Sequence, residues 1–161
     1  VAHFSSSQKI NAGATLTFDQ TSEALPKPKL WHPAHPFMYS AHTTVSEGGT
    51  VVDDYTTPFG IRWFKWTADQ GFFLNGEHYY FHGANVHQDH AGWADATTDA
   101  GSYRDVKFMK DAGFDFIRGS QYPHHPAFAD ACDTLGGRVG AENGGWAAGG
   151  AHKEGACTAS C

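Results

Sequence analysis

The 161-residue sequence contains no apolar stretch near the roughly 20 residues that a membrane-spanning helix needs. Its first ten residues, VAHFSSSQKI, lack the basic and apolar regions of a secretory signal peptide. Lysine and arginine never cluster, and the formal net charge is −6 with histidine neutral, unlike the basic surface of a nucleic-acid-binding protein. We therefore expect a soluble chain with neither a membrane nor a nucleic acid as partner. The compartment stays open: periplasmic, secreted or cytoplasmic.

Cysteine is also scarce, and the number and spacing of its three residues argue against two kinds of site. Cys132, Cys157 and Cys161 are odd in number and form no Cys-x-x-Cys pair, which argues against a disulfide framework and a cysteine-based zinc site. Several histidines and one aspartate have metal-binding side chains: His87, Asp89, His90, His124 and His125. Consecutive residues of an extended chain point in opposite directions, so only a subset could meet one ion. We therefore disfavour a histidine-rich metal site.

The first 60 residues carry the two-residue periodicity of β-strands. Apolar and polar residues alternate over 14–20 (ATLTFDQ) and over 37–45 (FMYSAHTTV). The turn 46–49 leads into TVVDDYTTPFG, which is typical of a hairpin partner. The proline-rich stretch 25–36 fits a connection or an edge. This pattern predicts an antiparallel sandwich, with surface or packing roles for His32, His35 and His42.

From residue 61 onward the pattern changes to strands that alternate with helices. Asn75-Gly76 between apolar runs predicts a hairpin that leads into YYFHGANVH, residues 79–87. A helix is expected from a Ser102 cap to Gly113, with Asp105 completing a capping box, then a strand in FDFIRGS, residues 114–120. A second helix is expected to start at Pro126 and to end at Gly136. These βαβ units predict a parallel sheet or the start of a barrel.

A third parallel strand should follow Gly136, but the sequence there is unusual. Residues 137–141 (GRVGA) offer almost nothing to bury, whereas a central parallel strand is normally rich in Val, Ile and Leu. Residues 136–161 form an atypical tail rich in glycine and alanine. Either this tail is disordered or its residue identities are uncertain, so no function is inferred from it alone.

Polar residues gather where each predicted parallel strand ends. In an α/β barrel these ends converge on the face where active sites assemble. A single histidine after a strand is more often an ordinary loop residue, but the joint placement favours a ligand site; for His82, inside the strand-like part, a structural role is favoured. The three groups are His87, Gln88, Asp89 and His90; Arg118, Ser120, Gln121, Tyr122, His124 and His125; and Glu142 with Asn143.

These segments resemble glycoside hydrolase family 2, in particular its β-galactosidase-type members. The resemblance covers residues 25–136 in unbroken order and includes LWHPAHPFMY, DDYTTPFGIRWFKW, GFFLNGEHYYFHGANVHQDH and DVKFMKDAGFDFIRGSQYPHHPAFADACDTLG. It implies a partial immunoglobulin-like β-sandwich over 1–60, followed by the first βα units of a (β/α)8 TIM barrel over 61–161. It also implies that GAENGGW, residues 140–146, falls at the third barrel strand.

The resemblance also assigns expected roles to individual residues. The family motif R-G-V-N-R-H corresponds to residues 82–87, so His87 takes the role of a sugar contact, whereas His82 and Val86 replace the motif's two arginines. In the second motif Gln121 stands where a sugar-contacting histidine is usual, and Arg118 resembles the arginine that steadies the nucleophilic carboxylate. The expected substrate-binding residues are His87, Gln121, Asn143 and Asp89, supported by Arg118, Asn85, Tyr122 and Glu142.

The resemblance implies a retaining exo-β-glycosidase that hydrolyses terminal β-linked sugars through a glycosyl-enzyme intermediate. Its two catalytic glutamates belong on the fourth and seventh barrel strands, so we expect both to lie beyond residue 161 and the chain alone to be inactive. The remainder of the catalytic domain would then be a partner. Mg²⁺, Na⁺ and homo-oligomerisation remain open.

Two alternatives belong to other classes. In the first, the chain is a non-catalytic carbohydrate-binding or structural module that uses His87, Gln121 and its tryptophans. In the second, catalysis stays within the chain and Asp89 with Glu142 supplies the carboxylate pair. Turnover of a chromogenic β-galactoside distinguishes them.

Overall fold

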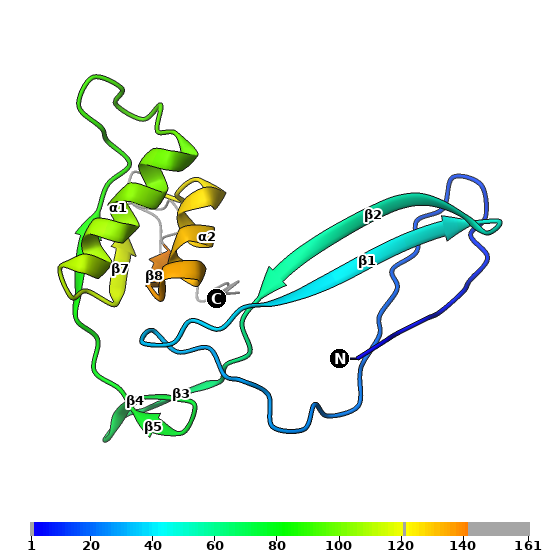
Figure 1. The fold of residues 1–161 in the computed structure, drawn as a ribbon, viewed down its shortest axis with the longest axis horizontal. Coiled ribbons are helices and arrows are strands. Elements are labelled where there is room, and N and C mark those ends of the chain that lie inside the picture. Colours follow the sequence, from blue (N-terminus) through cyan, green and yellow to red (C-terminus); the bar gives the residue numbers. More distant parts are fainter. Residues whose placement is uncertain (1, 121, 142–161) are drawn as a thin grey trace.

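The computed structural model describes residues 2–120 and 122–141, which form eight strands in three sheets and two helices. Strands β1 and β2 form a long arm that reaches away from the part of the chain that contains the helices (Figure 1). Within residues 2–120 and 122–141, neither helix has the length and apolar character needed to cross a membrane.

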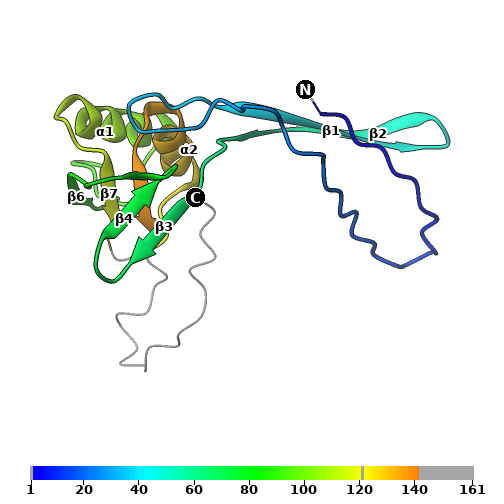
Figure 2. The same ribbon diagram turned by 90° about the horizontal axis from the view of Figure 1, so that it is seen from below.

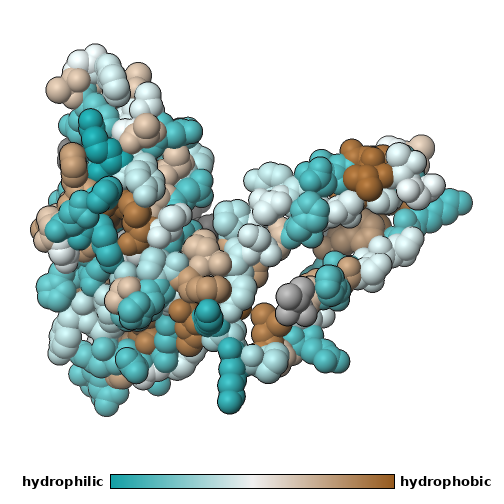
Figure 3. Space-filling model, viewed as in Figure 1, coloured by the Kyte–Doolittle hydropathy of each residue, from teal (hydrophilic) through white to brown (hydrophobic). Residues whose placement is uncertain are grey.

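The arm is the antiparallel hairpin predicted from the first 60 residues. β1 (Tyr39–Glu47) and β2 (Thr50–Phe59) pair along their length with one shift of register between Val45 and Ser46. The turn between them uses positive φ angles at Gly48 and Gly49. The predicted strand at residues 14–20 is wrong, because no strand forms there. Alternation alone does not make a strand, since a ladder also needs a neighbour with free backbone groups. Apolar side chains remain visible along the arm (Figure 3).

A small antiparallel sheet follows the arm and confirms the Asn75-Gly76 hairpin. Its strands are β3 (Phe64–Thr67), β4 (Gly71–Leu74) and β5 (Glu77–His78), in that order. Asn75 and Gly76 have φ angles of 53° and 91°, the left-handed conformation that a tight hairpin turn requires. In Figure 2 this sheet lies beside the helical part of the chain.

The third sheet is parallel, as predicted, and carries the candidate site. Its strands are β6 (Gly83–Val86), β7 (Phe116–Gly119) and β8 (Arg138–Ala141), with β7 in the centre. The expectation that 137–141 has almost nothing to bury needs correction. Val139 packs on the core, and a Cβ atom on Gly140 would come within 2.8 Å of the Phe116 ring. Glycine thus lets the strand lie close under an aromatic ring.

Helix α1 (Asp99–Asp111) begins earlier than the sequence predicted. Its N-cap is Thr98, whose hydroxyl accepts a hydrogen bond of 3.1 Å from the Gly101 amide. Ser102 is therefore not a cap but a buried residue of the first turn, and Asp105 completes no capping box. A helix start at Thr98 rather than at Ser102 is favoured because it places Asp99 in the first turn, where a negative charge is favourable.

Helix α2 (Pro126–Leu135) has the predicted limits. Pro126 occupies the first turn, where its missing amide costs nothing, and Gly136 ends the helix with a φ angle of 80°. The N-cap is His125, whose ring nitrogen accepts from the Ala127 amide at 3.3 Å.

The core lies between the parallel sheet and the two helices. It consists of Val106, Ile117, Phe128, Ala131 and Cys132, with Val86, Met109, Leu135 and Val139 packed around them. The other face of the sheet meets the β3–β4–β5 sheet, where the guanidinium of Arg138 lies 4.7 Å from the Phe72 ring centroid and 5.4 Å from that of Phe81. The aromatic rings of Phe72 and Phe81 thus contact the sheet at the amino ends of β7 and β8.

The proline-rich segment before the arm is a connection, as expected, but it is fixed to the helices. Trp31 is fully buried and its indole donates a 2.8 Å hydrogen bond to the Asp133 carbonyl in α2. Lys110 of α1 donates to the Pro33 carbonyl at 2.7 Å. A Cβ atom on Gly136 would lie 2.2 Å from the same Pro33 oxygen, so this approach requires glycine.

Candidate functional site

Two polar side chains face away from the helices on neighbouring parallel strands. Val86 and Ile117 pack toward the helical core, and because strand side chains alternate, Asn85 and Arg118 point to the opposite face. The two residues are paired in the register, and the Arg118 Nη1 atom lies 3.4 Å from Asn85 Oδ1. The same nitrogen lies 3.3 Å from the Ser120 hydroxyl.

The loops after β6 and β7 meet beside this pair. His87 is exposed directly after β6, and its ring centroid lies 6.4 Å from that of Tyr122 in the loop after β7. The Tyr122 hydroxyl accepts a 2.7 Å hydrogen bond from the backbone N–H of Gln88. The structure therefore brings together five residues from the two strand ends, which we call the rim: Asn85, His87, Arg118, Ser120 and Tyr122.

His124 lies between the rim residue Tyr122 and helix α2. Its ring stacks on Tyr122 with centroids 5.4 Å apart and contacts Phe128 of α2 at 4.6 Å. Burial lowers the pKa of His124, and hydrogen bonding to the backbone of Tyr122 and Val86 offsets this only in part. The ring is therefore neutral near pH 7.

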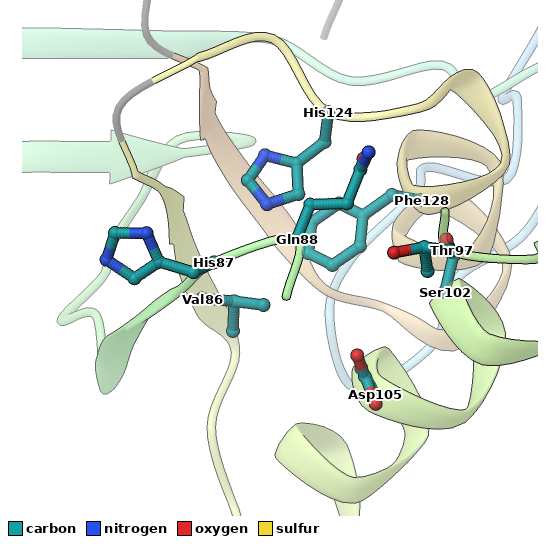
Figure 4. A pocket seen from close by; sticks show the side chains of 8 residues that line it. All are labelled: Val86, His87, Gln88, Thr97, Ser102, Asp105, His124 and Phe128. Carbon is teal, nitrogen blue, oxygen red and sulfur yellow. The ribbon is translucent and has the colours of Figure 1, made fainter. Parts of the chain in front are cut away.

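A small recess of about 10 Å³, roughly the room that one water molecule needs, lies between the loop after β6 and the two helices, on the helix side of the sheet (Figure 4). Polar groups from α1 and from both loops reach it. It is too small for a sugar ring and belongs to the support of the rim. Its lining residues are Val86, His87, Gln88, Thr97, Ser102, Asp105, His124 and Phe128.

Other predicted site residues lie elsewhere. Asp89 is exposed beyond the rim. His90, expected among the polar groups at the strand end, turns toward α1, where its Nε2 atom lies 2.5 Å from Asp105. The sequence did not indicate Asp105 as the partner of His90, because Asp105 was expected to complete a capping box. Three further predicted residues, Gln121, Glu142 and Asn143, fall outside the described residues.

Among the described residues, no three side chains of histidine, cysteine, aspartate or glutamate come together as metal ligands. The rim itself offers an amide, an imidazole, a guanidinium and hydroxyl groups. Such groups donate and accept hydrogen bonds in fixed directions, which suits recognition of a ligand with several hydroxyl groups.

Gln88 was expected among the polar residues at the end of the first parallel strand but was given no role of its own. Its side chain links three segments of the site, as its Oε1 atom accepts from the His125 amide at 2.9 Å and its Nε2 atom donates to the Asp95 carbonyl at 3.3 Å. The sequence places Gln88 next to His87 but gives no sign of partners 7 and 37 positions away.

Comparison with known proteins identifies the fold. The family model described as "Glycosyl hydrolases family 2" matches residues 2–62, and the model described as "Glycosyl hydrolases family 2, TIM barrel domain" matches residues 67–160. Among solved structures, a β-glucuronidase of Bacteroides uniformis has a TM-score of 0.70 and 38% identity, over 73% of this chain and 14% of that one. A β-glycosidase of Bacteroides vulgatus gives 0.71 and 31%, over 76% and 16%.

Curated relatives carry two kinds of name. A β-glucuronidase of Bacteroides fragilis is 34% identical over 79% of this chain and 18% of its own length. A β-galactosidase of Bacteroides ovatus is 34% identical over 84% of this chain and 16% of its own length. The chain thus spans less than a fifth of the length of these relatives. With both family models matched in sequence order and the parallel strands of a barrel formed, the chain belongs to glycosyl hydrolases family 2 and comprises sandwich-domain sequence followed by the start of the TIM barrel.

Proposed function

We propose that this chain forms part of a retaining exo-β-glycosidase of the β-galactosidase type, and that the rim binds the terminal sugar. The observation that carries the proposal is the meeting of His87, Asn85 and Arg118 at the carboxyl ends of two adjacent parallel strands. In a TIM barrel this end of the strands is where catalytic sites assemble.

Four residues of the rim and four residues outside it have proposed roles. His87 and Asp89 hydrogen-bond sugar hydroxyl groups, together with Gln121 and Asn143. Arg118 orients the nucleophilic carboxylate, and Asn85 holds the guanidinium through the 3.4 Å contact. Tyr122 supports His87, and Glu142 supports Asn143.

The reaction needs two carboxyl groups about 5 to 5.5 Å apart. One protonates the glycosidic oxygen as the alcohol leaves, and the other attacks the anomeric carbon to form a glycosyl-enzyme, which water then hydrolyses. We propose that both are glutamates of barrel strands outside these 161 residues. The sandwich-domain part would end near residue 60.

The remainder of the barrel would also cover apolar surface. Phe64 and Trp66 of β3 are 47% and 65% exposed, beside the ring cluster under the parallel sheet. Large exposed aromatic groups next to a core are typical of a surface that another element covers. The covering element in this proposal is further polypeptide of the same catalytic domain.

The test uses the chain with chromogenic β-galactoside and β-glucuronide, together with NMR titration against methyl β-galactoside and methyl β-glucuronide. We expect no turnover, and sugar-induced shifts of the His87 ring that are larger with the galactoside. His87→Ala should abolish the sugar-induced shifts of the neighbouring Tyr122 ring, whereas His42→Ala, an exposed change in the β1 strand, should leave the shifts of both rings unchanged. Larger shifts with the glucuronide would instead favour a β-glucuronidase.

Two outcomes would replace the proposal. Turnover that Asp89→Asn or Glu142→Gln abolishes would place catalysis within the chain. Sugar-induced shifts at exposed tryptophans such as Trp63, with the His87 ring unmoved, would favour a carbohydrate-binding module.

A further inference from the structure

Three loops converge on a single side chain beside the rim. The Gln88 amide group contacts the loop after β7 through the His125 N–H at 2.9 Å, and the segment before α1 through the Asp95 carbonyl at 3.3 Å. Its backbone N–H donates to the Tyr122 hydroxyl at 2.7 Å. One residue therefore ties together the loop after β6, the loop after β7 and the lead into α1.

The chemistry of these contacts calls for a carboxamide. The side-chain oxygen accepts from one backbone amide while the nitrogen on the same carbon donates to a backbone carbonyl, and glutamine and asparagine are the side chains that carry this carboxamide group. Asparagine is one methylene shorter. A glutamate would keep the bond to His125 but turn a carboxylate oxygen toward the Asp95 carbonyl, which is repulsive.

The position of Gln88 explains why these bonds matter for the rim. His87 precedes it directly, and the Tyr122 hydroxyl that Gln88 holds belongs to the ring nearest His87. The His125 end of the contact fixes the first turn of α2, because His125 is its N-cap. Movement of either loop would change the separation of His87 and Tyr122.

We propose that Gln88 is a positioning residue that fixes His87 against Tyr122 and thereby sets the geometry of sugar binding. Gln88 does not touch the sugar in this proposal and acts only through the placement of His87 and Tyr122. The part concerning sugar rests on the proposed function, whereas the part concerning the two rings does not.

The test compares the chain with its Gln88→Glu and Gln88→Ala variants. Both should shift the NMR signals of the His87 and Tyr122 rings in the free chain. Affinity for methyl β-galactoside should fall about fivefold, which corresponds to loss of about one hydrogen bond. The melting temperature should change little, since the Gln88 side chain is only half-buried and does not belong to the apolar core. Gln70→Glu, in the β3–β4 turn, is the matched control and should change none of these quantities.

The outcomes separate the two proposals. If the unaltered chain binds the galactoside and Gln88→Glu binds it equally well with unmoved ring signals, the positioning role is wrong while the proposed function stands. If the unaltered chain binds no sugar, the ring signals alone decide: unmoved signals in Gln88→Glu reject the positioning role. A lower melting temperature with unchanged rings and affinity would reveal a structural role only.

Discussion

The Nη1 atom of Arg118 lies 3.4 Å from the Oδ1 atom of Asn85 on the neighbouring parallel strand. Both side chains are exposed on the sheet face away from the helices, so their removal should affect ligand binding more than folding. For Arg118→Ala we expect a change in the free energy of unfolding within about 0.5 kcal/mol. Without the guanidinium, Asn85 and Ser120 lose their contacts in the rim, so we expect the galactoside affinity, measured by NMR titration, to fall about fivefold. Arg104→Ala, an exposed arginine of α1, is the control, and equal losses in both variants would contradict the prediction.

The approach of Gly136 to Pro33 predicts a large difference between two glycine substitutions. Gly136 and Gly113 have similar φ angles of 80° and 88°, but a Cβ atom at Gly136 would lie 2.2 Å from the Pro33 carbonyl oxygen, whereas at Gly113 nothing lies within 4 Å. Gly113→Ala should cost about 1 kcal/mol for backbone strain alone. Gly136→Ala should cost at least about 2 kcal/mol more, because a backbone segment must move. Urea denaturation followed by circular dichroism measures both, and equal costs would rule out the close approach.

The core between the parallel sheet and the helices predicts a second contrast. Ile117 is 1% exposed and packs with Val106 and Phe128, whereas Phe108 on α1 is 63% exposed. Ile117→Ala should lower the free energy of unfolding by about 2–5 kcal/mol through lost contacts and a residual cavity. Phe108→Ala should change it by about 0.5 kcal/mol or less. Comparable losses in the two variants would mean that the helices do not pack on the sheet in this way.

The lowered pKa of His124 predicts a loss of stability in acid. Burial keeps this histidine neutral in the folded chain, whereas in the unfolded chain it binds a proton below its ordinary pKa of about 6.5. The unfolded state therefore holds more protons as pH falls below about 6.5, and the free energy of unfolding decreases. His124→Asn should weaken this decrease, as urea denaturation at several pH values will show. An NMR titration midpoint for His124 above 6.5 would contradict the argument.

Several elements could be predicted because their signals are local. The left-handed residues of the Asn75-Gly76 turn, Pro126 at the start of α2 and Gly136 at its end each follow from backbone chemistry within a few residues. The strand at 14–20 could not be judged in the same way. Whether an alternating segment forms a strand depends on a partner elsewhere, and the sequence does not name one.

The position of the site could be predicted from the order of the elements, whereas its long-range contacts could not. The order of strands and loops placed His87, Arg118 and Tyr122 at one rim, since carboxyl ends of parallel strands meet. The contacts that orient them could not be predicted. Gln88 to His125 and His90 to Asp105 span 37 and 15 positions, and each depends on how loops fold over the helices.

Phe116 has a further consequence for how this sheet assembles. A Cβ atom on Gly83 in β6 would lie 2.5 Å from its carbonyl oxygen, and one on Gly140 in β8 would lie 2.8 Å from the far edge of its ring. A shift of either outer strand by one residue would present a side chain where only hydrogen fits. The two glycines therefore favour the observed strand register over one shifted by a residue.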